Sequence, residues 1–368
     1  MTDGMDPGQG FTAAQLDFVS DGGSENPLRL EKPIKVTLAI TETCNLNCAL
    51  CYADCGAAGK RPELSTAQWL GIIEDLIADG IISIYIEGGE PLLRPDLVEL
   101  LSASTDRVFA MLRTNGTLAT PETAARLAAA NLGIALVDIW GATAATHDAL
   151  TGAEGSFELA CAGVRNLLEA GIETQMLFIL NRKNIAELDD YLRLAAELGV
   201  RTVGILRLYP LGRVKRQWRD YALSLDEMQQ AVSGLRPPEG LRIMRSWHPN
   251  NGNCCWQMSA INAFGDSIGC AYLREYVNYG NVLEVPFQET WNHPLCKQLR
   301  AGRVRKDCPD CTKSQGSRGG CRSTAFAFHS DFDAPDPFDL TLNEGVDLRE
   351  LPERLLDTKP RTEAPSGS

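Results

Sequence analysis

Short apolar runs alternate with longer segments of helical periodicity through the first two thirds of the chain. Six runs are rich in β-branched and aliphatic residues and predict buried strands, at 34–40, 81–87, 108–113, 134–139, 174–180 and 202–208. Helical spacing follows each run, at 66–78, 96–104, 121–130, 157–170, 185–198 and 225–232. This alternation predicts βα units around a parallel sheet. Six units are too few to close an eight-stranded barrel, so we expect an α/β fold built as a partial, open (β/α)6 TIM-like barrel.

The pattern changes near Pro237-Pro238. Beyond this pair, short segments rich in Gly, Asn and Cys show no long helical period until 290–300. Proline and glycine punctuation of this kind marks a boundary, and we expect a small, irregular C-terminal domain. The predicted organisation is a loose leader at 1–33 with one short helix at 13–19, the barrel at 34–240, the second domain at 241–342, and a charged tail at 343–368 that forms a short helix followed by disorder.

Charge and hydropathy exclude some classes of partner. The chain has 368 residues and a net charge of −13, which argues against a broad basic face for nucleic acid or anionic lipid. No apolar run reaches the roughly 18 residues of a membrane-spanning helix. The N-terminus lacks the cationic and apolar regions of a signal peptide. We therefore expect a cytoplasmic protein that binds neither nucleic acid nor membranes.

The cysteines change the picture further. There are 12, and disulfides are rare in a reducing cytoplasm. Scattered buried thiols account for Cys161 and Cys296, which lie in helical patterns. The others bunch at 44–55 and 254–321 with short, regular gaps. Clustered cysteines in such a chain favour metal or redox chemistry.

The first cluster directly follows the first predicted strand. Cys44, Cys48 and Cys51 lie on one tight loop, one ligand short of the four thiolates usual for a [4Fe–4S] cube. An iron without a protein ligand can bind a substrate or cofactor. A zinc site stays open as an alternative, because Cys55 could supply a fourth ligand.

This Cys-x3-Cys-x2-Cys loop resembles the signature of the radical S-adenosylmethionine (SAM) superfamily, and the resemblance covers roughly residues 34–342. It implies that Cys44, Cys48 and Cys51 are the catalytic cluster ligands and that the open iron takes the amino and carboxylate groups of SAM. It also implies reductive cleavage of SAM to a 5′-deoxyadenosyl radical, with a flavodoxin or ferredoxin as electron donor. Leu50 replaces the aromatic residue usual before the third cysteine, so Tyr52 becomes the candidate for the adenine contact.

The same resemblance extends to the ends of the next two predicted strands. Gly88-Gly89-Glu90-Pro91 matches the motif that holds the amino group of SAM, where glycines allow close backbone approach and a carboxylate suits an ammonium. Thr114 and Asn115 belong to a Thr-Asn-Gly element that lies near the ribose in the family. Chemistry in barrels of parallel strands lies at these carboxyl ends.

Two further strand ends carry charged candidates. Asp138 could bind the ribose hydroxyls, or it could simply cap a loop. Arg207 could hold the carboxylate of SAM or of a substrate as a fork, or it could form a surface ion pair.

The second cluster resembles the SPASM/twitch extension of radical SAM enzymes and implies at least one auxiliary iron–sulfur cluster. Ser317 and Asp339 stand where that extension has cysteines. Two ligand sets stay open: Cys254 or Cys255 with Cys270 and Cys321, or the twitch-like set of Cys255, Cys270, Cys308 and Cys311. A zinc site that includes Cys308 and Cys311 is the alternative to both.

The whole pattern is similar to the SPASM peptide maturases of the pyrroloquinoline-quinone and mycofactocin type. The resemblance implies hydrogen abstraction from a precursor peptide, followed by oxidation, crosslinking or decarboxylation. The alternatives are a small-molecule enzyme, such as an aminoglycoside or sugar dehydrogenase or epimerase, and a non-catalytic iron–sulfur or zinc scaffold. A basic run near the sixth strand would either face solvent or bind an acidic peptide or a phosphate; it contains Arg213, Lys215, Arg216 and Arg219.

Overall fold

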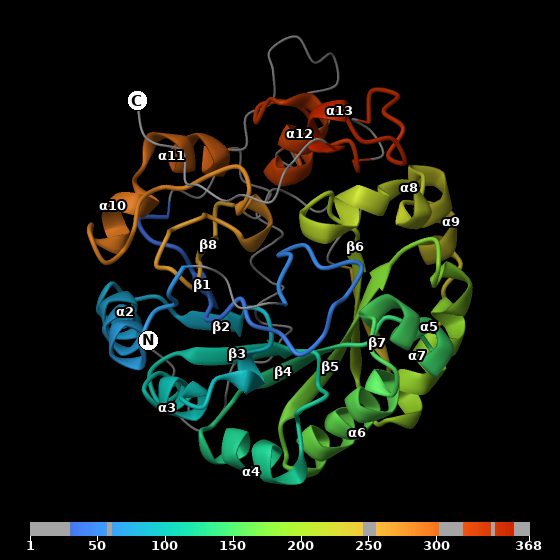
Figure 1. Ribbon diagram of the computed structural model, residues 1–368, viewed down its shortest axis with the longest axis horizontal. Helices are drawn as coiled ribbons and strands as arrows, with labels where there is room; N and C mark the ends of the chain where they lie inside the picture. The colour runs from blue at the N-terminus through green and yellow to red at the C-terminus, as the bar shows by residue number, and fades with distance from the viewer. Residues whose placement is uncertain (1–29, 57–60, 246–254, 302–318, 340–342, 357–368) are drawn as a thin grey trace, which may run out of the picture.

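A single parallel sheet organises the chain. The computed structural model describes residues 30–56, 61–245, 255–301, 319–339 and 343–356. Within them, eight parallel strands run in the order β7-β6-β5-β4-β3-β2-β1-β8, and the edge strands β7 and β8 do not pair with each other (Figure 1). The strands are β1 (Lys35–Ala39), β2 (Ser83–Glu87), β3 (Phe109–Thr114), β4 (Ile134–Asp138), β5 (Glu173–Leu180), β6 (Thr202–Arg207), β7 (Arg242–Arg245) and β8 (Met258–Ile261).

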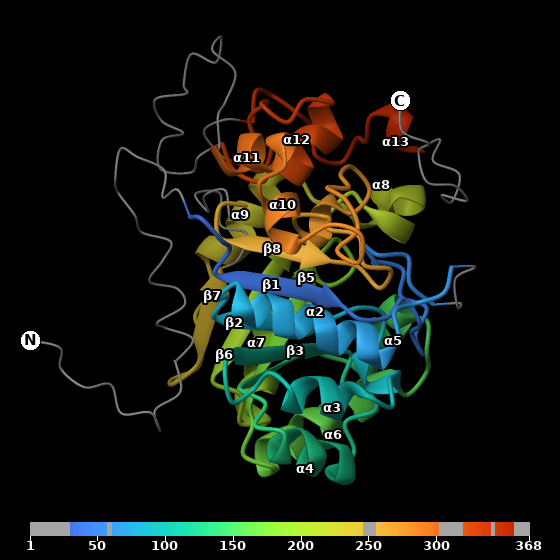
Figure 2. The same cartoon turned by 90° about the vertical axis from the view of Figure 1, so that its left-hand side faces the viewer.

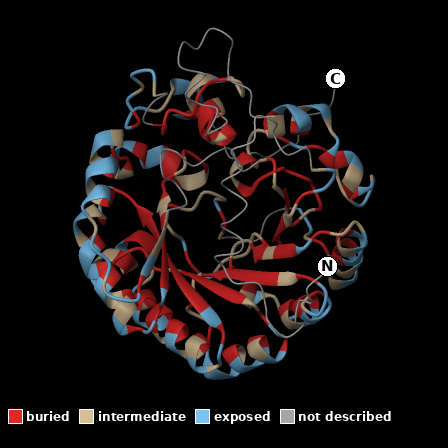
Figure 3. Cartoon of the chain, turned by 180° about the vertical axis from the view of Figure 1, so that it is seen from behind, coloured by how far each residue is buried: buried red, intermediate tan, exposed pale blue. Residues whose placement is uncertain are grey.

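Helices cover the convex face of this sheet (Figure 1). They are α2 (Thr66–Ala78), α3 (Leu97–Ser102), α4 (Pro121–Ala129), α5 (Ala144–Thr151), α6 (Ser156–Glu169) and α7 (Leu188–Glu197). Figure 3 shows the strands and the inner sides of these helices buried and the outer sides exposed. The main core lies between the two layers and includes Leu38, Trp69, Ile86, Phe178 and Tyr191. Helix α2 begins where Ser65 and Gln68 form a reciprocal capping box, which satisfies amides that would otherwise lack partners.

The open barrel predicted from the sequence is confirmed, with two further strands. All six predicted strands are present, and β7 and β8 extend the sheet at its edges. Each of the added strands has four residues, too few for a periodic pattern to reveal. The helix predicted at 185–198 begins with a 3-10 turn at Ile185–Glu187, and α5 was not predicted.

The C-terminal part lies over the open side of the barrel (Figures 1 and 2). The helix predicted at 290–300 is two helices, α10 (Phe287–Trp291) and α11 (Pro294–Ala301), because Pro294 cannot continue the first helix. Among the residues described after Ala301, the helices are α12 (Arg322–His329) and the four-residue α13 (Glu353–Leu356), which is the short helix expected in the tail. The helix expected at 13–19 lies outside the described residues. The division at 241 stays a prediction, although β7 and β8 belong to the same sheet as the barrel strands.

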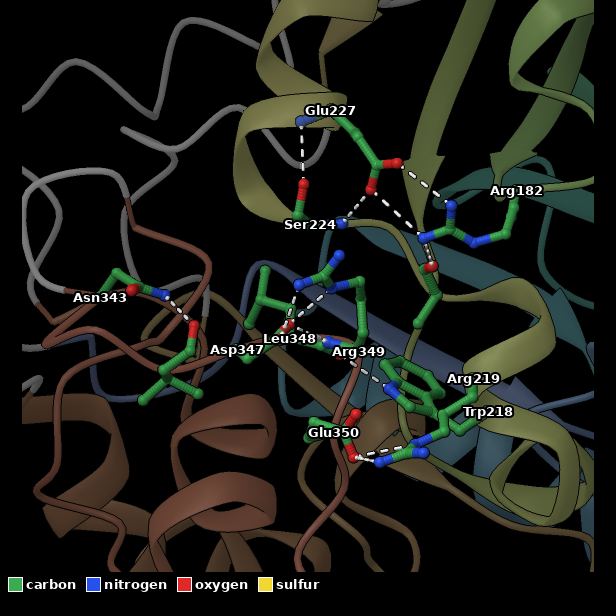
Figure 4. A network of polar contacts seen from close by, with 12 residues as sticks. Arg182, Trp218, Arg219, Ser224, Glu227, Asn343, Asp347, Leu348, Arg349 and Glu350 are labelled. Atoms are coloured by element: carbon green, nitrogen blue, oxygen red, sulfur yellow. Dashed lines mark hydrogen bonds and ion pairs between the residues drawn. The ribbon is translucent and has the colours of Figure 1, made fainter.

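The segment at 343–356 is tied to the barrel through α8 (Trp218–Tyr221), close to the start of α9 (Leu225–Ser233) (Figure 4). The indole Nε1 of Trp218 donates to the carbonyl of Leu348 at 2.7 Å, and Arg219 pairs with Glu350. These contacts hold the end of the described chain against the barrel. In the part of the chain that the structure describes, no helix is long and apolar enough to cross a membrane.

Candidate active site

The loop at 40–56, called the cluster loop below, follows β1 at the carboxyl edge of the sheet (Figure 2). It carries Cys44, Cys48 and Cys51 as free, half-buried thiols. The amide of Leu46 donates to Cys44 Sγ at 3.5 Å, and the amide of Cys55 donates to Cys51 Sγ at 3.4 Å. Amide donors of this kind stabilise thiolate ligands, so the loop suits a cluster held by three cysteines.

The electrostatics of the three thiols reflect their closeness. Burial raises the pKa of Cys44 to about 11 and that of Cys48 well above its ordinary value, and the neighbouring thiolates add to both shifts. The Cys55 thiol donates a hydrogen bond to Cys51, which lowers the pKa of Cys51 and raises that of Cys55. Cys55 therefore lies against Cys51, one of the three predicted cluster ligands.

The Gly88-Gly89-Glu90-Pro91 motif packs directly on the cluster loop. The amides of Gly89 and Glu90 donate to the carbonyls of Thr41 and Thr43 at 2.6 and 2.8 Å. A Cβ atom on Gly88 would lie 2.4 Å from the Thr41 oxygen, and one on Gly89 would lie 2.1 Å from the Thr43 oxygen. Only glycine permits this backbone contact, which seats the second βα loop against the cysteines.

Glu90 links three predicted elements of the SAM pocket. Its buried carboxylate accepts from the Leu92 amide at 2.9 Å, the Thr114 hydroxyl at 2.7 Å and the Asn115 amide at 2.8 Å. Burial raises its pKa to about 7 against these hydrogen bonds. The Asn115 side chain donates in turn to Asn45 of the cluster loop at 2.9 Å. The structure thus brings together all the SAM-pocket residues predicted at the ends of β2 and β3, and their roles toward SAM stay predictions.

Asp138 and Tyr52 have partners that the sequence did not reveal. Arg113, at the end of β3, donates to both Asp138 oxygens at 2.7 and 2.9 Å. The hydroxyl of Tyr52 donates to Glu87, at the end of β2, at 2.7 Å. The carboxyl ends of β2, β3 and β4 therefore present an ion pair and a hydrogen-bonded phenol beside the cluster loop.

Arg207 forms a buried ion pair, so the expected alternative of a surface pair is wrong. Its Nη1 lies 2.9 Å from Asp336 Oδ2, and the two side chains are 8% and 5% exposed. The guanidinium lies over the rings of Tyr209 and Phe338, at 4.9 Å from each centroid. Its Nε is buried without a hydrogen-bond partner among the described residues. This pair joins the end of β6 to the C-terminal part of the chain.

Stacked tyrosines lie between the two cysteine regions. Tyr209 and Tyr272 are parallel, with ring centroids 3.8 Å apart, and Tyr52 lies 5.0 Å from Tyr272. Sequence reasoning missed Tyr209 and Tyr272. Their signals were present, because Tyr272 follows Cys270 by two residues and Tyr209 follows a strand end.

The second cysteine region is described in part. Cys255, Cys270 and Cys321 are described, whereas Cys254, Cys308, Cys311 and Ser317 lie outside the described residues. Burial is the largest cause that raises the pKa of Tyr279, and the thiols of Cys255 and Cys270 raise it further. The thiols of Cys255 and Cys321 both raise the pKa of Arg322, which burial lowers. Asp339 is buried, and the choice of auxiliary ligands stays a prediction.

A zinc-type site is not preformed in the described part. There, no three His, Cys, Asp or Glu side chains converge closely enough for a single metal ion. A [4Fe–4S] cube needs a wider spacing, because each thiolate binds a different iron. The cluster loop, with three free thiols and amide donors to two of them, fits a cube with one open iron.

Comparisons with known proteins agree with this site. The family described as the radical SAM superfamily matches residues 38–195, and the iron–sulfur cluster-binding domain SPASM matches 254–312. Mycofactocin maturase MftC of Mycobacterium tuberculosis is 33% identical over 330 residues, which are 84% of this chain and 83% of that protein. An AdoMet-dependent heme synthase of Methanosarcina barkeri is 30% identical, covering 83% and 96%. A PqqA peptide cyclase of Gluconobacter oxydans is 28% identical, covering 83% and 90%.

The fold agrees as well. The structure of Streptococcus suis SuiB bound to S-adenosylmethionine superposes with a TM-score of 0.70 at 15% identity, over 84% of this chain and 78% of SuiB. The loop of three cysteines, the glycine motif packed on it, and the match over most of MftC agree on one family. This chain belongs to the radical SAM superfamily and carries a SPASM iron–sulfur domain.

Proposed function

We propose that this radical SAM enzyme abstracts a hydrogen atom from a precursor peptide and thereby oxidises, crosslinks or decarboxylates one of its residues. The observation that carries the proposal is the 33% identity to mycofactocin maturase over 84% of the chain, which spans both the barrel and the SPASM region. The similarity to a cyclase named for the PqqA peptide supports a peptide as the class of substrate.

Membership in the family brings a [4Fe–4S] cluster, SAM and auxiliary iron–sulfur chemistry to this chain. When bound, the cluster supplies the electron that splits SAM into methionine and a 5′-deoxyadenosyl radical. Cys44, Cys48 and Cys51 would hold that cluster, and the Gly88-Gly89 backbone would bring the second loop within reach of SAM. Flavodoxin or ferredoxin as the electron donor is part of the proposal.

The carboxyl edge of the barrel would be the reaction chamber. There, Arg113 and Asp138 neutralise each other, and Tyr52 is held by Glu87. These fixed partners let the chain orient polar groups of SAM and substrate without rearranging charges. The stacked Tyr209 and Tyr272 would keep water away from the radical on the side of the auxiliary cysteines.

A second candidate substrate is an iron tetrapyrrole. The AdoMet-dependent heme synthase is 30% identical and is covered over 96% of its length. The aminoglycoside or sugar alternative stays an untested prediction.

The test uses anaerobically reconstituted enzyme with SAM and dithionite. Short peptides encoded beside its gene, synthesised with deuterium at single positions, are compared with Fe-coproporphyrin III, and the triple variant of Cys44, Cys48 and Cys51 to Ala is the control. Deuterium transferred from a peptide into 5′-deoxyadenosine would support the proposal and locate the reacting position. SAM cleavage stimulated by the tetrapyrrole alone would refute it.

The same preparation counts the clusters. About eight irons in the wild type and about four in the triple variant would mean one SAM cluster and one auxiliary cluster, given four irons per cube. About twelve irons would mean a second auxiliary cluster. About four irons in the wild type with none in the triple variant would leave no auxiliary cluster.

A further inference from the structure

We propose that Arg213 is a positioning residue that fixes the cluster loop and places a positive charge beside its cysteines. The sequence grouped Arg213 with a basic run that would face solvent or bind an acidic ligand. The structure divides that run, because the side chains of Arg213 and Lys215 are 19% and 7% exposed whereas those of Arg216 and Arg219 are 60% and 74% exposed. The proposal rests on membership in the radical SAM superfamily and not on a peptide substrate.

Arg213 contacts the cluster loop at four points. Its Nη1 donates to the carbonyl of Cys48 at 2.8 Å, and its Nη2 donates to that of Cys55 at 2.6 Å. Its Nε donates to Asp54 Oδ1 at 3.0 Å, and its own amide donates to the carbonyl of Cys51 at 3.0 Å. Each guanidinium nitrogen is therefore used on one loop. A planar fork makes such divergent contacts, and the single ammonium of a lysine does not.

The backbone that carries Arg213 is itself fixed against the same loop. Gly212 has a φ of +61°, and a Cβ atom there would lie 2.3 Å from the Cys51 carbonyl oxygen. The Gly212 amide donates to Glu275 Oε1 at 2.7 Å, and Lys215 pairs with the other oxygen of Glu275. Arg213 thus reaches the loop from a short arm with little freedom to move.

The anchor of this arm belongs to the segment that bears an auxiliary cysteine. Glu275 follows Cys270 by five residues, and its neighbour Arg274 pairs with Glu42 at 2.6 Å, just before Cys44. Two consecutive residues of this segment therefore hold the cluster loop. Arg274 binds Glu42 directly, and Glu275 binds the amide of Gly212, the residue before Arg213. The order of the cluster loop depends on a part of the chain more than 200 residues away.

The charge of Arg213 acts on the cysteines as well as its hydrogen bonds. Its guanidinium interacts electrostatically with the thiolates of Cys48 and Cys51. A cluster gains negative charge when it is reduced, so a nearby cation favours the reduced state and raises the reduction potential. The hydrogen bonds and the charge of Arg213 can be tested separately, because Arg213→Lys keeps the positive charge but loses the planar guanidinium.

The experiment compares Arg213→Gln, Arg213→Lys and the matched control Arg216→Gln in the full chain. Arg216 lies on the same turn, and its nearest carboxylate is Asp54 at 3.8 Å. Clusters are reconstituted anaerobically, their loss to a chelator is timed, and the potential of the SAM cluster is titrated by electron paramagnetic resonance. Both Arg213 variants should lose the cluster about 10- to 100-fold faster than wild type. Only Arg213→Gln should shift the potential to more negative values, and Arg216→Gln should match the wild type.

Hydrogen exchange of the cluster-free protein separates positioning from general stability. In Arg213→Gln, the amides of 44–55 should exchange faster while those of β3 to β5 stay as in the wild type. Cluster loss within twofold of wild type, with unchanged exchange at 44–55, would overturn the proposal. A rise spread evenly over the strands would also overturn it, because Arg213 would then support the fold as a whole. None of these readouts needs a substrate, so they fail or succeed independently of the peptide proposal.

Discussion

The buried pair of Arg207 and Asp336 should be the most costly ion pair to break in the described structure. Asp336 accepts from Arg207 at 2.9 Å and from the Cys321 amide at 2.9 Å through Oδ2, and from the Thr324 hydroxyl at 2.6 Å and the Phe338 amide at 3.1 Å through Oδ1. Burial alone would raise its pKa, but Arg207 and these hydrogen bonds hold the pKa below the ordinary value. The carboxylate is therefore ionised and has a donor at every position.

The change Asp336→Asn converts one acceptor oxygen into an amino group. In either orientation, that group faces two donors, and Arg207 keeps an uncompensated charge in a site where its own side chain is 8% exposed. Removing one partner of a buried pair costs about 3–5 kcal/mol. For a chain of 368 residues, we expect the melting temperature to fall by about 4–6 °C. Since the lowered pKa of Asp336 contributes stability only above the acid range, the loss should be constant from about pH 6 to pH 8.

Anaerobic thermal unfolding of reconstituted protein at one scan rate would measure the effect. The control is Glu74→Gln, which breaks the pair of Glu74 with Arg107; that pair has two hydrogen bonds of similar length but lies on the surface, and its loss should change little. The double change Arg207→Met with Asp336→Asn should cost clearly less than the sum of the single changes, because no charge remains unpaired. A fall for Asp336→Asn no larger than for Glu74→Gln, or full additivity in the double change, would refute the reasoning.

Three other outcomes are expected. Burial lowers the pKa of His147 to about 4 from 6.5, so the folded state disfavours its protonation; stability should be complete above pH 6.5 and fall by about 3 kcal/mol towards pH 4, and His147→Asn should flatten this slope in a pH series of urea melts. Gly89→Ala places a methyl group 2.1 Å from the Thr43 carbonyl oxygen and should abolish stable iron binding, whereas Gly71→Ala, in an open site on α2, should raise stability by about 0.5–1 kcal/mol; unchanged iron in Gly89→Ala would contradict the packing argument. Asp339→Ala should leave the iron count at about eight, and a loss of about four irons would make Asp339 a ligand of the auxiliary cluster.

Local pattern was sufficient for much of the scaffold. The long apolar runs became β1 to β6, because a strand buried on both faces needs nothing beyond its own sequence to appear as such a run. Local pattern did not predict β7 and β8, which have four residues each. They pair in parallel with β6 and β1 because the sheet presents free edges there. Pro294 was a visible signal for the division between α10 and α11, but the helical spacing across it concealed the break.

The positions of a few residues along the chain were enough to predict its iron–sulfur chemistry. Cys44, Cys48 and Cys51 lie within eight residues of one another, so their spacing indicated a metal site with a cluster or zinc as the alternatives. The resemblance to the radical SAM superfamily then favoured the cluster and implied the role of the glycine motif after the next strand. These features lie in short stretches of the chain, so they can be recognised without knowledge of the fold.

The partners of the charged candidates could not be read from the sequence and became visible in the folded chain. Arg113 met Asp138 because neighbouring parallel strands end side by side, and Arg207 met Asp336 across 129 residues of sequence. Arg213 contacts the cluster loop because Gly212 packs against that loop and Glu275 fixes the backbone of Gly212. A charged side chain that folding removes from water needs a partner of opposite charge. Which residue becomes that partner depends on strand register and on the path of distant segments, and a local sequence pattern does not contain this information.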